Sequence, residues 1–361
     1  MPEIYNTTPF AVDSEGLFDA AARQHLILML SATFEVRSGC ALAPAEKQSP
    51  VRETDEYHGE PGQSSLRYAS DVALEKTKVD VLINGTAYAP LSGSAQEVEV
   101  GVQVGDLRKR LIVSGDRFWE FGRMPSPPKP FETMPIRYER SFGGTTAGPN
   151  ASADLRNTVG VGFEGAISSS PEVSTEVANI EYPDQRISSS KSLPSPAGFG
   201  PLCRYWIPRS EFAGTYGEKW LREEYPLLPA DFDVRFFECA PRDQQLPAIE
   251  GGELVTLTNM TPEGVWTFRL PRLMVPVRLL YADRTGATEL RVDTLLIEPD
   301  ARTFTLTARA KLLLERNRGP LEEIVVGDVT DGWWRARVSD KRYLDRKGMN
   351  GASGRPSYLV I

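Results

Sequence analysis

The stretch EVEVGVQVGDLRKRLIV, residues 97–113, decides the fold class of this chain. Its four valines, at positions 98, 100, 102 and 104, occupy every second position, which places them on one face of a β-strand. Gly105-Asp106 then predicts a turn into a second strand over residues 107–113. The stretch therefore predicts a β-hairpin.

The second strand of this hairpin carries the basic run Arg108-Lys109-Arg110. Charged residues beside a turn are typical of a strand face that lies in water. We therefore expect all three side chains to be solvated.

Two segments upstream extend the β pattern. Residues 25–36, HLILMLSATFEV, are long, branched and apolar, which favours a strand buried on both faces; a buried helical turn is the alternative. Residues 79–83, VDVLI, run into Asn84-Gly85, which is typical of a tight turn, and residues 86–89 follow. This second segment predicts another hairpin.

Short apolar runs separated by turn residues continue downstream. We expect strands over residues 234–237, 254–258, 266–270, 275–281, 290–297 and 304–314. Residues 217–224, GEKWLREE, predict one short helix. The whole pattern predicts a mainly β chain, with an antiparallel β-sandwich-like architecture, long Gly/Pro-rich loops and a few short helices.

Composition shifts suggest four parts of the 361-residue chain. Residues 1–144 form an N-terminal β lobe, and residues 145–200, dense in Pro, Gly and Ser, form a long loop region. Residues 201–320 form a C-terminal β lobe packed on the first. Residues 321–361 are an extension with a basic, Gly-rich tail at 341–355, which we expect to be mobile.

Charge and cysteine content limit the partners and the compartment. With 49 acidic and 41 basic residues the net charge is −8, so nucleic acid is an unfavourable partner. Three scattered cysteines fit a reducing compartment. The start has no basic leader before an apolar core, and the longest strongly apolar run, residues 26–30, is too short to span a bilayer. We expect a cytoplasmic protein without membrane insertion.

The sequence offers few residues for catalysis. The two histidines, His25 and His58, match no ligand spacing and no nucleophile motif. Residues 160–165, GVGFEG, match GxGxxG, but no strand-to-helix context surrounds them, so a Gly-rich loop with positive φ is the better interpretation. We expect no catalytic residues, no cofactor and no metal.

One pair of acids keeps an enzymatic alternative open. Asp231 and Asp233, with several Trp and Tyr residues elsewhere, would suit a carbohydrate-binding or carbohydrate-active cleft. A turn in which the Asp side chains cap the following segment is the commoner role for such residues. Large aromatics in strands likewise usually fill the core.

Several short motifs occur in a fixed order through most of the chain. They are DVLING (80–85), GDRFW (115–119), MPIRYERSFGG (134–144), PAGFGP (196–201), Arg204, Trp206, Pro208, Arg209, GTY (214–216), Trp220, PADFD (229–233), DQQ (243–245) and DTL (293–295). Taken together, they resemble a bacterial family, long labelled a domain of unknown function, that is associated with type VI secretion systems. Gly217 stands where the family pattern has Asp, and the chain lacks the pentapeptide repeats sometimes fused to this domain.

The resemblance implies a non-enzymatic adaptor or chaperone that binds a type VI effector and helps load it onto the VgrG spike. The candidate partner-binding or family-motif residues are Tyr138, Glu139, Arg140, Phe142, Gly143, Gly144, Phe199, Arg204, Trp206, Arg209, Tyr216 and Trp220. No catalytic residues follow from the resemblance. A structural component of a phage-like assembly is a further alternative.

Overall fold

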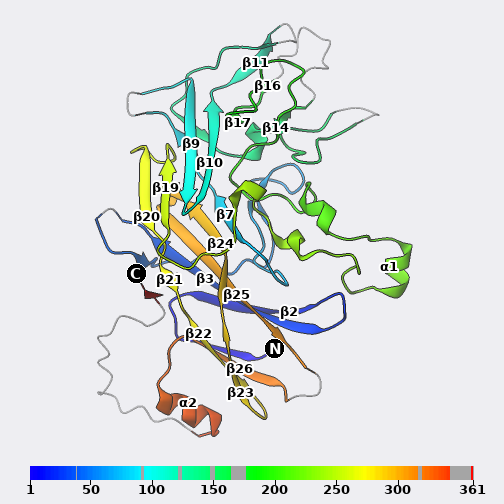
Figure 1. Cartoon of the computed structure of the whole chain (residues 1–361), viewed down its shortest axis with the longest axis vertical. Helices are drawn as coiled ribbons and strands as arrows, with labels where there is room; N and C mark the ends of the chain where they lie inside the picture. Colours follow the sequence, from blue (N-terminus) through cyan, green and yellow to red (C-terminus); the bar gives the residue numbers. More distant parts are fainter. Residues whose placement is uncertain are drawn as a thin grey trace.

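The computed structural model of the chain describes residues 1–37, 39–90, 93–120, 124–146, 151–163, 176–315, 319–341 and 359–360. Figure 1 shows β-sheets through most of the molecule, with the two α-helices at its periphery. The chain is mainly β, most strand pairs are antiparallel and helices are few, as the sequence predicts.

The largest sheet has seven strands, in the order β18-β7-β24-β25-β3-β2 with β4 added beside β3. Their bounds are β18 (Gln245–Leu246), β7 (Val79–Ile83), β24 (Arg291–Glu298), β25 (Thr303–Leu313), β3 (Gln24–Glu35), β2 (Ala11–Phe18) and β4 (Ala43–Pro44). Residues 25–34 of β3 are all buried, which confirms the predicted strand with two covered faces.

The second sheet has five strands, in the order β17-β10-β9-β19-β20. Their bounds are β17 (Ile180–Glu181), β10 (Leu107–Ser114), β9 (Glu97–Val104), β19 (Leu254–Thr258) and β20 (Val265–Arg269). Strands β9 and β10 form the predicted hairpin: Leu107 is the partner of Val104, and Gly105 takes a φ of 56°. The four alternating valines are buried, as expected.

The remaining strands form smaller sheets. A four-stranded sheet contains β1 (Glu3–Asn6), β26 (Leu321–Val326), β22 (Pro276–Tyr281) and β23 (Thr285–Glu289), in that order. A three-stranded one contains β12 (Met124–Pro125), β11 (Arg117–Glu120) and β16 (Glu176–Val177). Paired strands are β13 (Thr133–Pro135) with β8 (Thr86–Tyr88), β14 (Phe142–Gly143) with β15 (Val161–Gly162), β21 (Arg272–Leu273) with β27 (Leu359–Val360), and β5 (Glu56–Tyr57) with β6 (Leu66–Tyr68).

The helical segments are short. The α-helices are α1 (Glu218–Glu223), which confirms the predicted short helix, and α2 (Asp331–Val338). The 3-10 helices are η1 (Tyr138–Arg140), η2 (Arg209–Phe212), η3 (Val234–Phe237), η4 (Arg242–Gln244) and η5 (Pro299–Ala301).

Aromatic rings join the two largest sheets. The ring centroids of Phe34 on β3 and Phe304 on β25 lie 5.1 Å apart, and Phe304 stacks on Phe268 of β20 at 4.9 Å. Because Phe268 belongs to the five-stranded sheet, the two sheets pack against each other through these buried rings. This packing fits the predicted β-sandwich-like architecture.

Strands from the two predicted lobes lie side by side in the seven-stranded sheet. Strand β7 pairs with β24, and β3 pairs with β25 along eleven residues. The described part of residues 145–200 contains β15, β16 and β17. The boundaries at residues 144, 200 and 320 stay predictions. The basic tail is predicted to be mobile, but apart from Lys341 its residues lie outside the described part of the chain.

The predicted hairpin at Asn84-Gly85 is wrong. Strand β7 pairs with β24 and β18, whereas β8 pairs with β13. The amide of Asn84 donates to the carbonyl of Ile297 at 3.0 Å, so the chain continues beside β24 before it leaves the sheet. A partner more than 200 residues away has overridden the local turn preference.

Two further local predictions are wrong. Residues 234–237 form η3 and not a strand, because the carboxylate of Asp233 accepts a hydrogen bond from the amide of Arg235 and begins a helical turn. Lys109 is buried at 4% exposure, although we expected it in water. It lies on the same inward strand face as Leu107 and Leu111.

Candidate binding site

Ten of the twelve family-motif residues gather in one region and contact other parts of the same chain. They lie in residues 138–144 and 197–209, which pack on each other and on residues 157–160; we call these contacts the motif framework. The rings of Tyr138 and Trp206, both buried, meet edge to face at 5.4 Å. Gly198 is required beside them, since a Cβ there would lie 2.7 Å from Cζ of Tyr138.

The glycine pair of the motif allows a close backbone approach. Phe142 and Gly143 pair in parallel with Val161 and Gly162. Gly143 takes a φ of 147°, and a Cβ there would collide with the carbonyl oxygen of Asn157. The side-chain amide of Asn157 donates to the carbonyls of Tyr138 and Phe142 at 2.8 and 3.0 Å. Only glycine fits this position without strain.

Gly144 and Gly160 lie next to this contact. The amide of Gly144 donates to the carbonyl of Asn157 at 2.8 Å, and a Cβ on Gly144 would lie 2.7 Å from the carbonyl oxygen of Gly160. Gly162 has a φ of 96°, which confirms positive φ within the GxGxxG match, but Val161 and Gly162 form strand β15 and not a loop. Residues 164 and 165 of that match lie outside the described residues.

The charged motif residues also have internal partners. The carboxylate of Glu139 accepts from the amide and hydroxyl of Ser65 at 2.6 and 2.7 Å. Arg140 reaches Asp116 and Asn179 at 3.4 and 3.3 Å.

Arg204 and Arg209 hold the 197–209 part of the framework to other segments of the chain. Arg204 pairs with Asp55 at 2.8 Å. Arg209, 3% exposed, donates to the carbonyls of Leu202 and Phe236 at 2.6 and 3.0 Å. Both arginines therefore tie loops to neighbouring chain segments.

Tyr216 and Trp220 lie apart from the framework, at α1 on the side of the molecule (Figure 1). Their rings meet edge to face at 4.8 Å, and Trp220 also contacts Tyr225 at 5.5 Å. Tyr216 is 53% exposed, and the indole of Trp220 donates to the carbonyl of Leu227. Tyr216 is thus an exposed member of the predicted set, and Trp220 is partly buried beside it.

Buried Lys109 joins the framework to the sheet at Phe199. Its ammonium donates to Asp243 at 3.0 Å and to Gln244 at 2.6 Å, and it lies 5.5 Å from the centre of the Phe199 ring. Gln244 in turn donates to the carbonyl of Phe199 at 2.9 Å. Burial lowers the pKa of Lys109 to about 8, an effect that Asp243 opposes.

A second buried ionic cluster, which the sequence did not predict, surrounds Asp80 on β7. Its carboxylate accepts from Lys76 at 2.8 Å and from the amides of Cys239 and Ala240. Although burial acts in the opposite direction, Lys76 and these hydrogen bonds hold the pKa of Asp80 below its usual value. Lys76 also donates to Thr294 at 2.9 Å.

Asp293 and Arg309 form the neighbouring pair of this cluster, and both are buried. Burial raises the pKa of the Asp293 carboxyl despite the nearby Arg309 and Lys76. Asp80, Asp293 and Thr294 belong to the DVLING and DTL motifs. Acidic residues inside apolar strands could have predicted this cluster, because a buried carboxylate needs a charged or hydrogen-bonding partner.

The residues considered for catalysis are engaged elsewhere. Asp231 accepts from the amide and hydroxyl of Thr215 at 2.9 and 2.7 Å, and Asp233 pairs with Arg235. His25 contacts Asp19 at 3.0 Å, while burial lowers the pKa of His58 to about 4. In the part of the chain that the structure describes, no three His, Cys, Asp or Glu side chains come together as a metal site would require.

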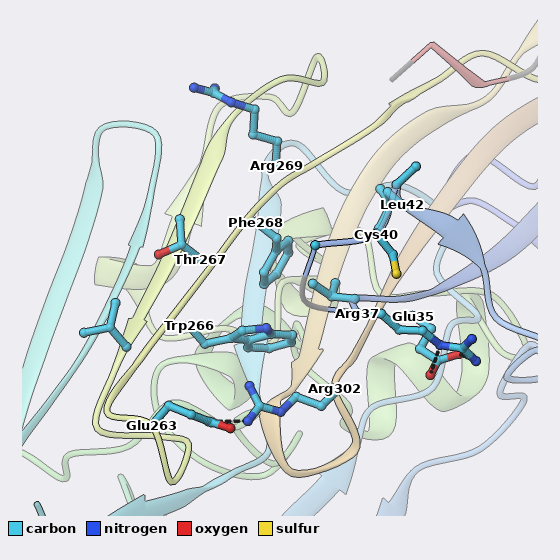
Figure 2. Close-up of a pocket in the computed structure, with 14 residues that line it drawn as sticks. Glu35, Arg37, Cys40, Leu42, Glu263, Trp266, Thr267, Phe268, Arg269 and Arg302 are labelled. Carbon is cyan, nitrogen blue, oxygen red and sulfur yellow. Dashed lines mark hydrogen bonds and ion pairs between the residues drawn. The ribbon is translucent and has the colours of Figure 1, made fainter.

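An open groove of about 970 Å³ lies beside β20. One wall is formed by residues 263 and 265–269, and the other by residues 35–37, 39–42 and 302. Figure 2 shows Trp266 and Phe268 extending from β20 toward the segment of Arg37 and Cys40, with Arg302 paired to Glu263 below them. None of the twelve predicted residues lines this groove.

The groove could not be found from the motif series. Its one sequence signal is the strand Val265–Arg269, whose residues alternate between exposed and buried. The opposite wall comes from a segment more than 200 positions earlier, so only the fold brings the two walls together.

A comparison with models of protein families gives a match over most of the chain. Residues 21–309 match the model of a family described as "Uncharacterized protein conserved in bacteria (DUF2169)". No curated protein and no solved structure matches the chain significantly. Among the described residues, no helix is long and apolar enough to cross a membrane.

Proposed function

Since the chain belongs to the DUF2169 family of bacterial proteins, we propose that it is a non-enzymatic adaptor that acts in the bacterial cytoplasm. It binds a type VI effector protein and helps load this effector onto the VgrG spike. The secretion role is supported by the ordered series of motifs, from DVLING to DTL, which resembles a family associated with these systems.

The observation that carries a protein-binding role is the open groove beside β20. Its walls hold aromatic and aliphatic side chains, namely Trp266, Phe268 and Leu42, together with polar groups. Grooves that combine an apolar floor with hydrogen-bonding groups suit segments of other proteins. At about 970 Å³ this groove reaches the upper end of the usual range for ligand sites.

The motif framework supports the same role indirectly. Its buried aromatic and hydrogen-bonded contacts fix loops that contain many glycines and prolines. A surface held in one conformation loses little entropy on binding, which favours affinity. The framework residues therefore act as scaffold, while binding occurs elsewhere.

The carbohydrate-acting alternative gains no support from the geometry. It needs two acids that converge on a substrate, whereas Asp231 holds Thr215 and Asp233 pairs with Arg235. We therefore keep the adaptor as the single proposed function.

Co-expression with a type VI effector and a VgrG spike of the same bacterium tests the proposal. We expect a stable complex that co-purifies from the soluble fraction. Complete absence of binding to both proteins contradicts the proposal. Sedimentation of the chain with purified sheaths would instead indicate a structural component of the assembly.

A further inference from the structure

Strand β20 is an edge strand of the five-stranded sheet. The amide of Asn259 donates to the carbonyl of Gly264, and the amide of Leu270 donates to the carbonyl of Glu253. Since hydrogen-bonded positions alternate along an antiparallel pair, Trp266 and Phe268 pair with β19. The backbone groups of residues 265, 267 and 269 therefore point away from the sheet.

Among the described residues, these outward backbone groups have no partner. Across the described residues, nothing donates to or accepts from the main-chain amides and carbonyls of Val265, Thr267 and Arg269. Val265 is 60% exposed, so the strand begins in water. The edge offers a row of unused donors and acceptors, which is what a pairing strand requires.

The groove runs along this edge. Its wall includes every residue from 265 to 269, and consecutive strand residues point to opposite faces of a sheet. Figure 2 shows Thr267 pointing away from Trp266 and Phe268, so contact with all five residues fits a groove beside the edge of the strand. The segment of residues 39–42 forms the far wall.

The other edges of the larger sheets are short, charged or covered. Strands β17 and β18 have two residues each. Strand β2 carries Asp13 and Glu15, and β23 carries Glu289. On β1, Tyr5 stacks under Trp333 at 4.8 Å. Natural proteins protect their edges in these ways. The sequence VWTFR of β20 has no acid, Lys or Pro, and its one charged residue, Arg269, donates to the carbonyl of Gly252.

A neighbouring segment already accepts an added strand. Three residues beyond β20, Arg272 and Leu273 of β21 pair with Val360 and Leu359 of β27. Main-chain pairing of an extended segment is thus a contact that this side of the fold makes.

The groove favours an uncharged occupant. Arg37 pairs with Glu35, and Arg302 pairs with Glu263. Arg269 donates to the carbonyl of Gly252 at 2.9 Å. The other residues of the groove are uncharged: Trp266 and Phe268 with Val265 and Thr267 on one wall, and residues 36 and 39–42 on the other.

We infer that β20 pairs with an extended segment of the partner protein, uncharged and with apolar side chains at alternate positions. Its backbone completes the hydrogen bonds of residues 265, 267 and 269, and its inward side chains contact the small part of Trp266 and Phe268, each 8% exposed, that the core leaves open. This inference rests on the proposed protein-binding function.

A proline substitution tests the pairing in the complex with the co-expressed effector. Thr267→Pro removes an outward N–H and leaves the bonds to β19 in place. We expect it to weaken effector binding at least about tenfold, because a hydrogen bond is lost and the ring obstructs the edge. Binding within about threefold of wild type overturns the inference.

The matched control is Ala287→Pro. Tyr281 donates to the carbonyl of Arg284, so by the same alternation residue 287 of edge strand β23 faces outward. This variant should bind the effector as wild type does. Should Thr267→Pro fail to fold, Val265→Lys decides in its place, since an edge lysine blocks strand addition.

Hydrogen exchange of the wild-type protein gives a test without substitutions. The amides of residues 265, 267 and 269 should exchange more slowly in the effector complex than in the free chain. If the effector binds and these amides stay unprotected, the inference is overturned while the adaptor function stands.

Two other outcomes also overturn it. If neither effector nor spike binds wild type, the adaptor function fails and the inference fails with it. If the same amides become protected without effector as the concentration of the chain rises, a second copy is the occupant of the edge.

Discussion

The motif framework and the edge of β20 use their polar groups in opposite ways. In the framework, Asn157, Arg209 and the paired glycines satisfy main-chain groups within the chain. Along β20, the outward main-chain groups of Val265, Thr267 and Arg269 remain open beside a groove. Motif residues that identify a family can therefore build the scaffold, while the binding surface lies on a strand that the motifs do not include.

This difference predicts that substitutions in the motif framework lower the free energy of unfolding, whereas substitutions at the edge of β20 weaken binding. A buried, satisfied group stabilises the fold, so its loss lowers the free energy of unfolding. An exposed edge contributes little to that free energy but offers its groups to a partner. Four substitutions or conditions, taken from the largest expected effect to the smallest, can break or sharpen this contrast.

Asp80→Ala should have the largest effect on stability. It leaves the ammonium of Lys76 buried without its carboxylate, together with the amides of Cys239 and Ala240. We expect a loss of about 3–5 kcal/mol in the free energy of unfolding, measured by urea denaturation. The double variant Asp80→Ala/Lys76→Met should recover part of this loss; equal losses in both would contradict the role of the unpaired charge.

The titration of Lys109 should have the second-largest effect on the free energy of unfolding. Its pKa is about 8 in the folded chain against 10.5 for an ordinary solvated lysine, so between these values the unfolded chain holds more protons. Stability from this group therefore rises with pH, by about 2 kcal/mol between pH 8 and pH 10.

Lys109→Met should remove that contribution. The difference in unfolding free energy between wild type and the variant isolates it from cysteines and tyrosines that titrate in the same range. Parallel pH profiles of the two proteins would show that Lys109 stays charged in the fold throughout. Asp243, which is partly exposed, stays solvated in the variant.

Gly143→Ala tests the close approach in the motif framework. The new Cβ would collide with the carbonyl of Asn157 at a φ of 147°, so we expect a loss of about 1–3 kcal/mol. Gly16→Ala is the control, because a Cβ there meets nothing within 4 Å. A thermal melt in which both variants behave alike would contradict the proposed constraint.

Val265→Lys should have the smallest effect on folding. Its side chain is exposed on the edge, so the free energy of unfolding should stay within about 0.5 kcal/mol of wild type. The same variant should nevertheless lose effector binding. A large loss of stability would show that the edge of β20 is part of the folding core, and would remove the contrast with the framework.

Local patterns predicted a good share of the fold. The β9–β10 hairpin, the buried strand β3 and helix α1 follow from alternation, apolar length and helix formers within each segment. These features depend on neighbours within a few residues, which the sequence displays directly.

Pairings between distant segments could not be predicted in the same way. Asn84-Gly85 has the composition of a hairpin turn, yet β7 pairs with β24. Lys109 lies in a basic run typical of a solvated strand face, yet it is buried and its partner Asp243 lies 134 residues away. For β7, a distant strand supplied hydrogen bonds that replaced the local turn. For Lys109, the inward face of β10 imposes burial, and the distant Asp243 offsets only part of its cost.

The sequence by itself determined the mainly β class, the hairpin of residues 97–114 and the family to which the chain belongs. Only the tertiary structure decided that ten motif residues have their partners within the chain, and that a strand edge without a partner among the described residues faces a groove. The physical reason is that the alternation of apolar and polar residues can be read within one strand. Burial and an open edge depend instead on which distant strands lie beside it.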